Sequence, residues 1–212
     1  MFSKNLVYHL AYMDNRCEMN SMRIINIIKS GPVIAAARYE KLDYAVRTRA
    51  CAVELVFAGL ADLMGNTFLE QRRRKSIFIH TDLLKGLSGD SEAIRFLRRY
   101  VKPAGIVSTK SPVIRAAKKE GLLTIQRVFL IDTISLDNAL KSVRENNPDA
   151  VEIMPGIATS IIPQIKERIT QPVIMAGLIR ERRQIVDALK WGADGVSLSK
   201  DDLWDQEFNG PA

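Results

Sequence analysis

Short apolar runs recur along this chain of 212 residues, each ending in polar or charged residues and followed by a segment with helical periodicity. Near-continuous apolar runs of this length are typical of parallel strands buried on both faces. Eight strands are expected, at residues 33–38, 52–58, 77–82, 105–109, 123–129, 150–154, 173–177 and 195–199. Helices are expected over residues 39–49, up to 74, up to 101, 112–120, 135–146, up to 169 and 181–191.

Strands that alternate with helices predict a parallel sheet, and eight such units predict a compact, single-domain (β/α)8 barrel. The alternative is an open, doubly wound sheet. Against it, the first strand ends in Ala35-Ala-Ala-Arg-Tyr39 and not in a glycine-rich fingerprint. We assign residues 22–212 to the barrel and residues 1–21 to an N-terminal extension, for which a mobile or loosely packed tail is the favoured interpretation.

Composition excludes several classes of protein. Hydrophobic residues make up 47% and charged residues 26%, which is ordinary for a soluble globular protein. No apolar run approaches the roughly 18 residues of a membrane span, and residues 1–21 lack a secretion signal. The two cysteines, Cys17 and Cys51, have neither a disulfide framework nor a metal-ligand spacing. We therefore expect a cytoplasmic protein with no membrane partner and no metal.

The net charge of +7 is unevenly distributed. Residues 70–119 contain 13 lysines and arginines and four acidic residues, so their excess of nine positive charges exceeds that of the whole chain. Such asymmetry indicates a polyanionic partner.

The ends of the last two strands are the first candidate site. Gly177 and Leu178 follow the seventh strand, and Ser197 and Ser199 lie at the end of the eighth. In many barrels the loops after these strands bind phosphate, because glycine lets backbone N–H groups approach an anion and small hydroxyls donate to it. The alternative is a tight turn between strand and helix.

Polar residues at the ends of the third to sixth strands form a second candidate set. His80 and Asp82 alternate with Ile79 and Thr81 and should share one face, while Lys110, Arg127 and Glu152 follow on later strands. Cations at the mouth of a barrel can bind an anion, and carboxylates can accept from hydroxyls, which would suit a small phosphorylated polyol. The alternative is that Arg127 and Glu152 pair inside the barrel, because buried charges need partners.

The same residues could in principle support catalysis. His80 with Asp82 could act as an acid–base pair, and Lys110 could form a Schiff base. Binding without turnover is equally compatible with them, and we expect no catalytic residue, no cofactor and no enzymatic activity.

Basic residues on two consecutive helices predict a second surface. In the first helix, basic residues fall at i, i+3, i+4 and i+7, which is one helical face, and Ile94, Leu97 and Val101 form the opposite apolar stripe. The next helix repeats the arrangement, so the two faces should merge. The residues expected to contact RNA are Arg95, Arg98, Arg99, Lys102, Arg115, Lys118 and Lys119. A solvated charged face is the alternative.

Five segments resemble the glycerol-3-phosphate-responsive antiterminators, the glycerol uptake operon antiterminator family. They are His80-Thr-Asp-Leu-Leu-Lys-Gly-Leu87, Lys102-Pro-Ala-Gly-Ile-Val-Ser-Thr109, Ile125-Gln-Arg-Val-Phe-Leu-Ile-Asp132, Pro148-Asp-Ala-Val-Glu-Ile-Met-Pro-Gly156 and Gly177-Leu-Ile-Arg180. The similarity covers about residues 23–204, in order and at matching spacing.

The resemblance implies a (β/α)8 barrel that binds glycerol 3-phosphate and then acts on leader mRNA of glycerol-catabolism operons, so that transcription passes a terminator. It implies phosphate near Gly177, Leu178, Ser197 and Ser199, and glycerol near His80, Asp82, Arg127 and Glu152. Lys110 and Gly156 complete the expected ligand set. The runner-up function is a barrel enzyme, an isomerase or aldolase of small sugar phosphates. A homo-oligomer stays open, as does a metabolite-binding module that acts through a protein partner.

Overall fold

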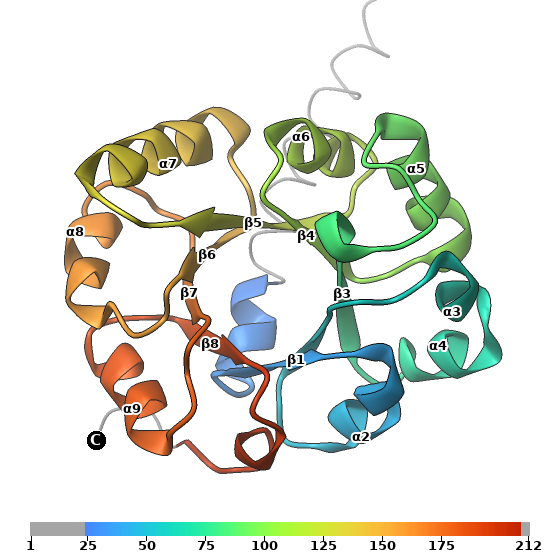
Figure 1. Cartoon of the computed structure of the whole chain (residues 1–212), viewed down its shortest axis with the longest axis horizontal. Helices are drawn as coiled ribbons and strands as arrows, with labels where there is room; N and C mark the ends of the chain where they lie inside the picture. Colours follow the sequence, from blue (N-terminus) through green and yellow to red (C-terminus); the bar gives the residue numbers. More distant parts are fainter. Residues whose placement is uncertain (1–23, 209–212) are drawn as a thin grey trace, which may run out of the picture.

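Eight parallel strands close into a barrel in chain order, with β8 returning to pair with β1 (Figure 1). The computed structural model describes residues 24–208, so the expected extension over residues 1–21 lies outside the described residues. The strands are β1 (Val33–Ala37), β2 (Ala52–Leu55), β3 (Ser76–His80), β4 (Gly105–Ser108), β5 (Leu123–Phe129), β6 (Ala150–Met154), β7 (Val173–Ala176) and β8 (Gly195–Leu198). The expected (β/α)8 barrel is confirmed.

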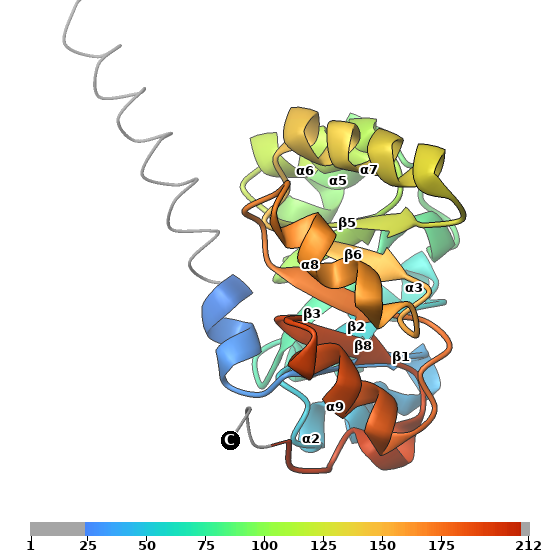
Figure 2. The ribbon, with the colours of Figure 1, turned by 90° about the vertical axis from the view of Figure 1, so that its left-hand side faces the viewer.

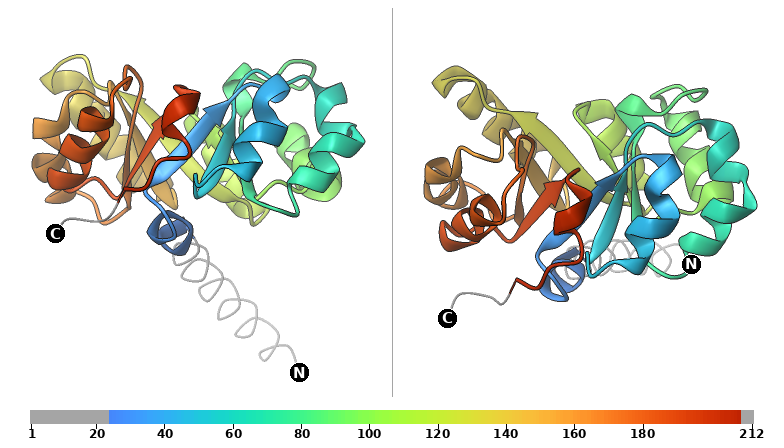
Figure 3. Two further views of the ribbon diagram at one scale, coloured as in Figure 1. Left: turned by 90° about the horizontal axis from the view of Figure 1, so that it is seen from below. Right: turned by 60° about the horizontal axis from the view of Figure 1, so that its bottom comes forward.

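Helices surround the barrel and cover the outer faces of its strands (Figures 2 and 3). The α-helices are α2 (Leu42–Arg47), α3 (Leu60–Met64), α4 (Asn66–Gln71), α5 (Ser91–Phe96), α6 (Ser111–Lys119), α7 (Thr133–Asn146), α8 (Ile162–Lys166) and α9 (Arg182–Lys190). Shorter helical turns are η1 (Tyr39–Lys41), η2 (Thr81–Leu83), η4 (Thr159–Ile161) and η5 (Asp201–Leu203), and η3 (Leu97–Val101) is a π-helix. Asp132 caps α7, since its carboxylate accepts from the backbone N–H of Ser135.

Several predicted boundaries are wrong at the carboxyl ends of strands. The second strand ends at Leu55 and not at residue 58, and Phe57 has a left-handed φ of 56°. The third strand ends at His80, because residues 81–83 turn into η2. The apolar run continues beyond the last paired residue of the strand where the following loop also packs on the core. Hydrophobicity alone therefore overestimates the length of the strand.

Two predicted helices also differ from the structure. The helix expected to end at residue 74 is α4 and ends at Gln71, and the segment around Gly59 and Gly65, expected to be a loop, contains α3. The helix expected up to residue 101 changes from α to π geometry at Leu97. Apolar spacing alone does not separate an α-turn from the slightly wider π-turn.

The barrel interior is filled by apolar side chains at its amino-terminal end. Ile34, Phe78 and Ile125 belong to this inner cluster. Ile24 and Ile28 join it from a helical segment over residues 24–29, which lies against this end of the barrel (Figures 2 and 3). Because the interior is packed at this end, a ligand can enter the barrel only at the carboxyl ends of the strands, where the (β/α)8 fold places its sites.

Within the described part of the chain, no helix combines the length and the apolar character needed to span a membrane.

Candidate ligand site and basic surface

Polar side chains replace the apolar filling at the carboxyl-terminal end of the barrel. Successive residues of a strand point to opposite faces, so each of these side chains stands two positions beyond a residue of the interior. Four of the five are almost fully buried, and Arg127 exposes 11% of its side chain. The five are Glu54 on β2, His80 on β3, Arg127 on β5, Glu152 on β6 and Ser197 on β8.

Arg127 lies at the centre of this polar layer. Its Nε donates to Glu152 Oε2 at 2.5 Å, and its Nη2 donates to Glu54 Oε1. Ser197 Oγ donates to the other oxygen of Glu54 at 2.9 Å. The pairing of Arg127 with Glu152, one of the two alternatives from the sequence, is therefore present. It also includes a second carboxylate, Glu54, which the sequence reasoning did not identify.

One arginine cannot neutralise two buried carboxylates, and Glu54 is therefore protonated more readily than a free glutamate. Burial, and then the charge of Glu152, raise the pKa of Glu54 to about 8, although Arg127 opposes both effects. Burial lowers the pKa of Arg127, but Glu152 and Glu54 outweigh it and the net shift is upward. At neutral pH, the layer therefore holds a protonated Glu54 beside one ion pair and is close to neutral overall.

His80 faces the same layer as a neutral imidazole. Burial and the charge of Arg127 lower its pKa to about 4. Its Nδ1 is buried without a hydrogen-bond partner within residues 24–208. An unsatisfied polar atom beside a polar opening marks a position where a ligand hydroxyl could donate or accept.

Asp82 has a different environment from the one expected. It lies in η2, where its carboxylate accepts from Ser108 Oγ at 2.7 Å and from both N and Oγ1 of Thr109 at 2.7 and 2.8 Å. Burial raises the pKa of Asp82, but these hydrogen bonds outweigh it and the net shift is downward. Asp82 thus fixes the loop after β4, which carries the exposed Lys110 at the start of α6.

The loop after β7 makes a tight turn with left-handed backbone geometry. Gly177 and Leu178 both have positive φ, of 78° and 62°. Within residues 24–208, no acceptor meets the backbone N–H of Leu178 or Ile179. A Cβ at Gly177 would approach the flexible end of Met154, at Cε, to 2.3 Å, so the positive φ of 78° is the main reason why glycine is favoured there.

Gly156 supports this loop from the neighbouring strand. Its N–H donates to the carbonyl of Gly177 at 3.0 Å, and a Cβ added to it would lie 2.6 Å from Ile179 Cδ1. Close packing of the two loops therefore explains why Gly156 is a glycine.

Ser197 and Ser199 differ in depth, because β8 ends at Leu198, between them. Ser197 is buried and bound to Glu54, whereas Ser199 lies just beyond β8 and is exposed. Arg38 follows β1, the neighbour of β8, and its guanidinium lies 5.0 Å from the ring centroid of Phe57. Glu54 was not identified from the sequence, where the isolated acid in the apolar run Ala52-Val-Glu-Leu55 was the available signal.

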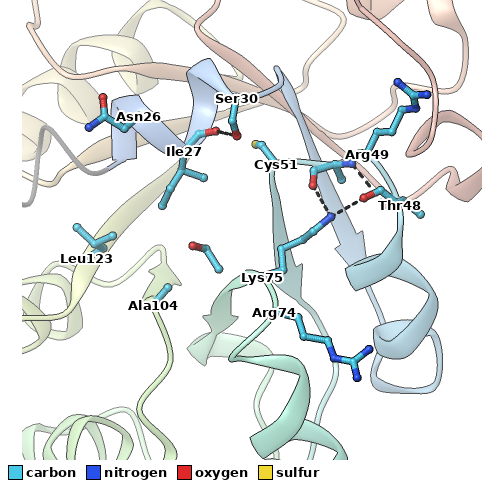
Figure 4. A pocket seen from close by; sticks show the side chains of 12 residues that line it. Asn26, Ile27, Ser30, Thr48, Arg49, Cys51, Arg74, Lys75, Ala104 and Leu123 are labelled. Carbon is cyan, nitrogen blue, oxygen red and sulfur yellow. Dashed lines mark hydrogen bonds between the residues drawn. The ribbon is translucent and has the colours of Figure 1, made fainter.

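At the opposite end of the barrel, a cleft of about 700 Å³ opens between the segment over residues 24–29 and the loops before β2 and β3 (Figure 4). Lys75 reaches across it and donates to the carbonyls of Thr48 and Ala50, both at 2.6 Å. Burial lowers the pKa of Lys75. Since its ammonium group is hydrogen-bonded to two backbone carbonyls, Lys75 has a structural role.

The basic residues do not form the continuous α-helical face that was expected. Residues 97–101 form a π-helix and Lys102 has a left-handed φ of 52°, so the 3.6-residue period ends before the basic run does. Ile94, Leu97 and Val101 are buried, as predicted.

Several of these cations already have partners within the chain. Arg95 pairs with Glu92 and Glu120, and Arg98 donates to the carbonyl of Glu120 at 3.1 Å. Arg115 donates to Asn146 Oδ1 at 2.8 Å, and Lys118 donates to the carbonyl of Asn147.

The remaining cations lie at the amino-terminal end of the barrel, where these helices end. Arg99, Lys102 and Lys119 are exposed and have no ion pair within residues 24–208. Arg72 donates to the carbonyl of Lys102 at 3.3 Å, which brings the loop before β3 beside the loop before β4. Tyr100 is half exposed, with the Arg99 guanidinium 5.6 Å from its ring centroid. The structure therefore adds an aromatic side chain to the basic surface.

No cluster of three or more histidine, cysteine or acidic residues that could hold a metal occurs among residues 24–208.

A closed parallel barrel with a charged layer at the carboxyl ends of its strands defines a (β/α)8 protein with a candidate ligand site at the barrel mouth. Residues 33–204 match the family model described as glycerol-3-phosphate responsive antiterminator. The chain belongs to this family, as the resemblance of its motifs predicted.

Individual relatives agree with this assignment. The chain is 30% identical over 184 residues to the uncharacterized protein YgcP of Escherichia coli, an alignment that covers 86% of this chain and 96% of YgcP. The crystal structure of a glycerol uptake operon antiterminator regulatory protein from Listeria monocytogenes has a TM-score of 0.78 at 28% identity, covering 82% of this chain and 95% of that one. An antiterminator-related protein from Thermotoga maritima gives 0.71 at 25% identity, covering 82% and 98%.

Proposed function

We propose that this protein is a transcription antiterminator that binds glycerol 3-phosphate at the barrel mouth and leader mRNA on its basic surface, and so regulates glycerol-catabolism operons from the cytoplasm. The single observation that carries the proposal is the family match over residues 33–204. Membership of this family would explain why one chain has both a polar barrel mouth and a basic surface suited to a polyanion. The protein would act by binding, without turnover and without a cofactor.

The arrangement of the mouth supports a phosphorylated polyol as ligand. The N–H groups of Leu178 and Ile179, together with the hydroxyl of Ser199, offer donors to a phosphate. The unsatisfied Nδ1 of His80 and the carboxylate of Glu152 offer partners to hydroxyl groups. Arg127 supports the hydroxyl end of the ligand by holding Glu152 in place.

Four further residues contribute at the edge of the site or beneath it: Asp82, Lys110, Gly156 and Ser197. Asp82 orders the loop that presents Lys110 to the anion, and Gly156 allows the loop after β7 to pack closely. Ser197 holds Glu54 beneath the ligand.

The basic surface supports a single-stranded RNA as partner. Arg99, Lys102 and Lys119 offer cations to phosphates, and Tyr100 offers a ring on which an unpaired base can stack. Arg95, Arg98, Arg115 and Lys118 border this surface and hold the helix ends that carry it.

The test is a titration of leader RNA from a glycerol-catabolism operon with and without glycerol 3-phosphate, each at two salt concentrations. Glycerol 3-phosphate should change the RNA affinity, and RNA should change the affinity for glycerol 3-phosphate by the same factor. An unrelated RNA of equal length is the control. Equal affinity for both RNAs, unchanged by the ligand, would exclude the proposed regulation.

The runner-up function, a sugar-phosphate isomerase or aldolase, rests on the fold and on the polar mouth. The N-acetylmannosamine-6-phosphate 2-epimerase of Clostridium perfringens has the same fold at 13% identity and a TM-score of 0.63, a likeness that extends to the fold alone. Assays of turnover therefore belong with the binding experiments.

A further inference from the structure

Five large apolar side chains are exposed around the carboxyl ends of β5, β6 and β7, and we call them the apolar rim. Their exposed fractions are 53% for Phe129, 88% for Ile131, 71% for Ile134, 48% for Ile157 and 61% for Leu178. Ligand binding does not require them, because a phosphorylated polyol is polar and Ile131 and Ile134 point largely to solvent. Exposed apolar side chains gathered on neighbouring loops are typical of protein interaction surfaces.

Backbone hydrogen bonds hold the three loops that carry the apolar rim side by side. Leu130 N–H donates to the carbonyl of Met154 at 2.8 Å, which ties the loop after β5 to the end of β6. Gly156 N–H donates to the carbonyl of Gly177 at 3.0 Å, which ties the loop after β6 to the loop after β7. Ile157 therefore lies between Ile131 on one side and Leu178 on the other.

The size of the rim fits the centre of an interface between two copies of this chain. Its exposed apolar surface is on the order of 500 Å², at the upper end of the range found on monomeric proteins. A stable interface buries about 800 Å² on each partner, with an apolar core and a polar border. Polar residues of the same loops can supply the remaining area.

Charges at the two ends of the rim make it complementary to itself. Asp132 lies at the β5 end, and Arg180 lies at the β7 end, where its guanidinium has no hydrogen bond or ion pair within residues 24–208. A two-fold axis near Ile157 would bring the β5 end of one copy against the β7 end of the other. It would thus bring Asp132 beside Arg180 twice, and Ile131 beside Leu178 twice.

We infer that the apolar rim is the interface of a two-fold symmetric homodimer, with Ile157 near its axis and Asp132 facing Arg180 of the second copy. This inference does not depend on the proposed function, since it rests on surface chemistry alone. The dimer leaves the basic surface exposed on each copy, because that surface lies at the opposite end of the barrel.

Sedimentation velocity of the full chain over a range of concentrations tests the inference. The expected result is a monomer–dimer equilibrium that Ile131→Asp weakens at least tenfold. Met64→Asp is the matched control: Met64 is 46% exposed on α3, across the barrel from α7 and α8 (Figure 1), and its change should leave the equilibrium unaltered. Because Ile131 is almost fully exposed, the variant should fold normally, which circular dichroism checks.

A cysteine cross-link tests the position of the axis. In a Cys17→Ser background, Ile157→Cys should form a covalent dimer on oxidation, whereas Met64→Cys should not. Burial raises the pKa of the Cys51 thiol to about 12, so Cys51 stays protonated and unreactive at pH 8. A chain that is monomeric up to millimolar concentration would overturn the inference, as would a dimer unaffected by Ile131→Asp. Equal cross-linking of both cysteine variants would overturn the two-fold arrangement.

Discussion

Arg127 and Glu152 are direct neighbours across the β5–β6 pair, and the guanidinium Nε lies 2.5 Å from the carboxylate Oε2. This ion pair sits at the base of the barrel mouth, and Glu54 shares it from the other side of the barrel. The candidate ligand site is therefore built on a charge cluster whose members stabilise one another and whose protonation depends on burial.

Removing Arg127 should destabilise the fold strongly. Arg127→Ala leaves Glu54 and Glu152 buried without a cation, and loss of one partner of a buried ion pair costs about 3–5 kcal/mol. Urea unfolding at pH 7 measures the change. Arg95→Ala is the control, because its partners Glu92 and Glu120 are partly exposed and the loss should stay below about 1 kcal/mol. Similar losses for both variants would contradict the role of Arg127.

Stability should fall as the pH rises from 6.5 to 8. The native chain keeps a proton on Glu54, with its pKa of about 8, that the unfolded chain releases near 4.5; the stability from this proton is lost as the pH rises through 8. His80 acts in the opposite sense. With its pKa lowered from 6.5 to about 4, it adds stability as the pH rises towards 6.5 and has little effect above it.

The expected slope between pH 6.5 and 8 is at most about 1.4 kcal/mol per pH unit for one proton. Glu54→Gln should remove it, because the amide keeps hydrogen-bonding groups and cannot titrate. Glu92→Gln, at an exposed position, should leave it in place. Thermal unfolding across this pH range measures both, and a slope retained in Glu54→Gln would contradict the raised pKa.

Glycerol 3-phosphate should stabilise the protein against heat, and glycerol should not, because the phosphate is expected to be the anchor. A ligand that binds only the native state raises the melting temperature with its concentration. Ser199→Asp should abolish the effect by charge repulsion near Leu178, whereas Ser30→Asp, at an exposed serine near the amino-terminal end of the barrel, should retain it. Equal protection by glycerol and glycerol 3-phosphate would exclude a phosphate anchor.

RNA affinity should depend on the exposed cations of the basic surface. Replacing Arg99, Lys102 and Lys119 by glutamine should weaken binding and make the slope of log affinity against log salt concentration shallower by about 2, since each neutralised phosphate contributes a slope near −0.7. Binding of glycerol 3-phosphate should stay intact, because these residues lie at the other end of the barrel. An unchanged affinity and slope would mean that this surface is only solvated.

No turnover is expected. Incubation with glycerol 3-phosphate or dihydroxyacetone phosphate should leave both unchanged, as followed by NMR over hours. A product that forms with the native chain and disappears in His80→Ala would replace the regulatory proposal with the enzymatic one, since His80 is the neutral imidazole of the mouth.

The sequence determined the number, order and approximate position of the strands, because burial on both faces requires near-continuous apolar runs and short connections close a barrel. It also predicted that Arg127, Glu152 and His80 lie at the carboxyl ends of strands. The burial of Ile94, Leu97 and Val101 followed from their helical spacing in the same way.

The tertiary structure alone decided which charges meet. Glu54 and Arg127 are 73 residues apart and come together because the barrel closes, and Ser197 reaches Glu54 across 143 residues for the same reason. Local sequence patterns do not predict pairs of residues that lie so far apart in the chain. The π-turn that interrupts the basic helix likewise depends on how Leu97 and Val101 pack on the barrel, which the charges along the chain do not encode.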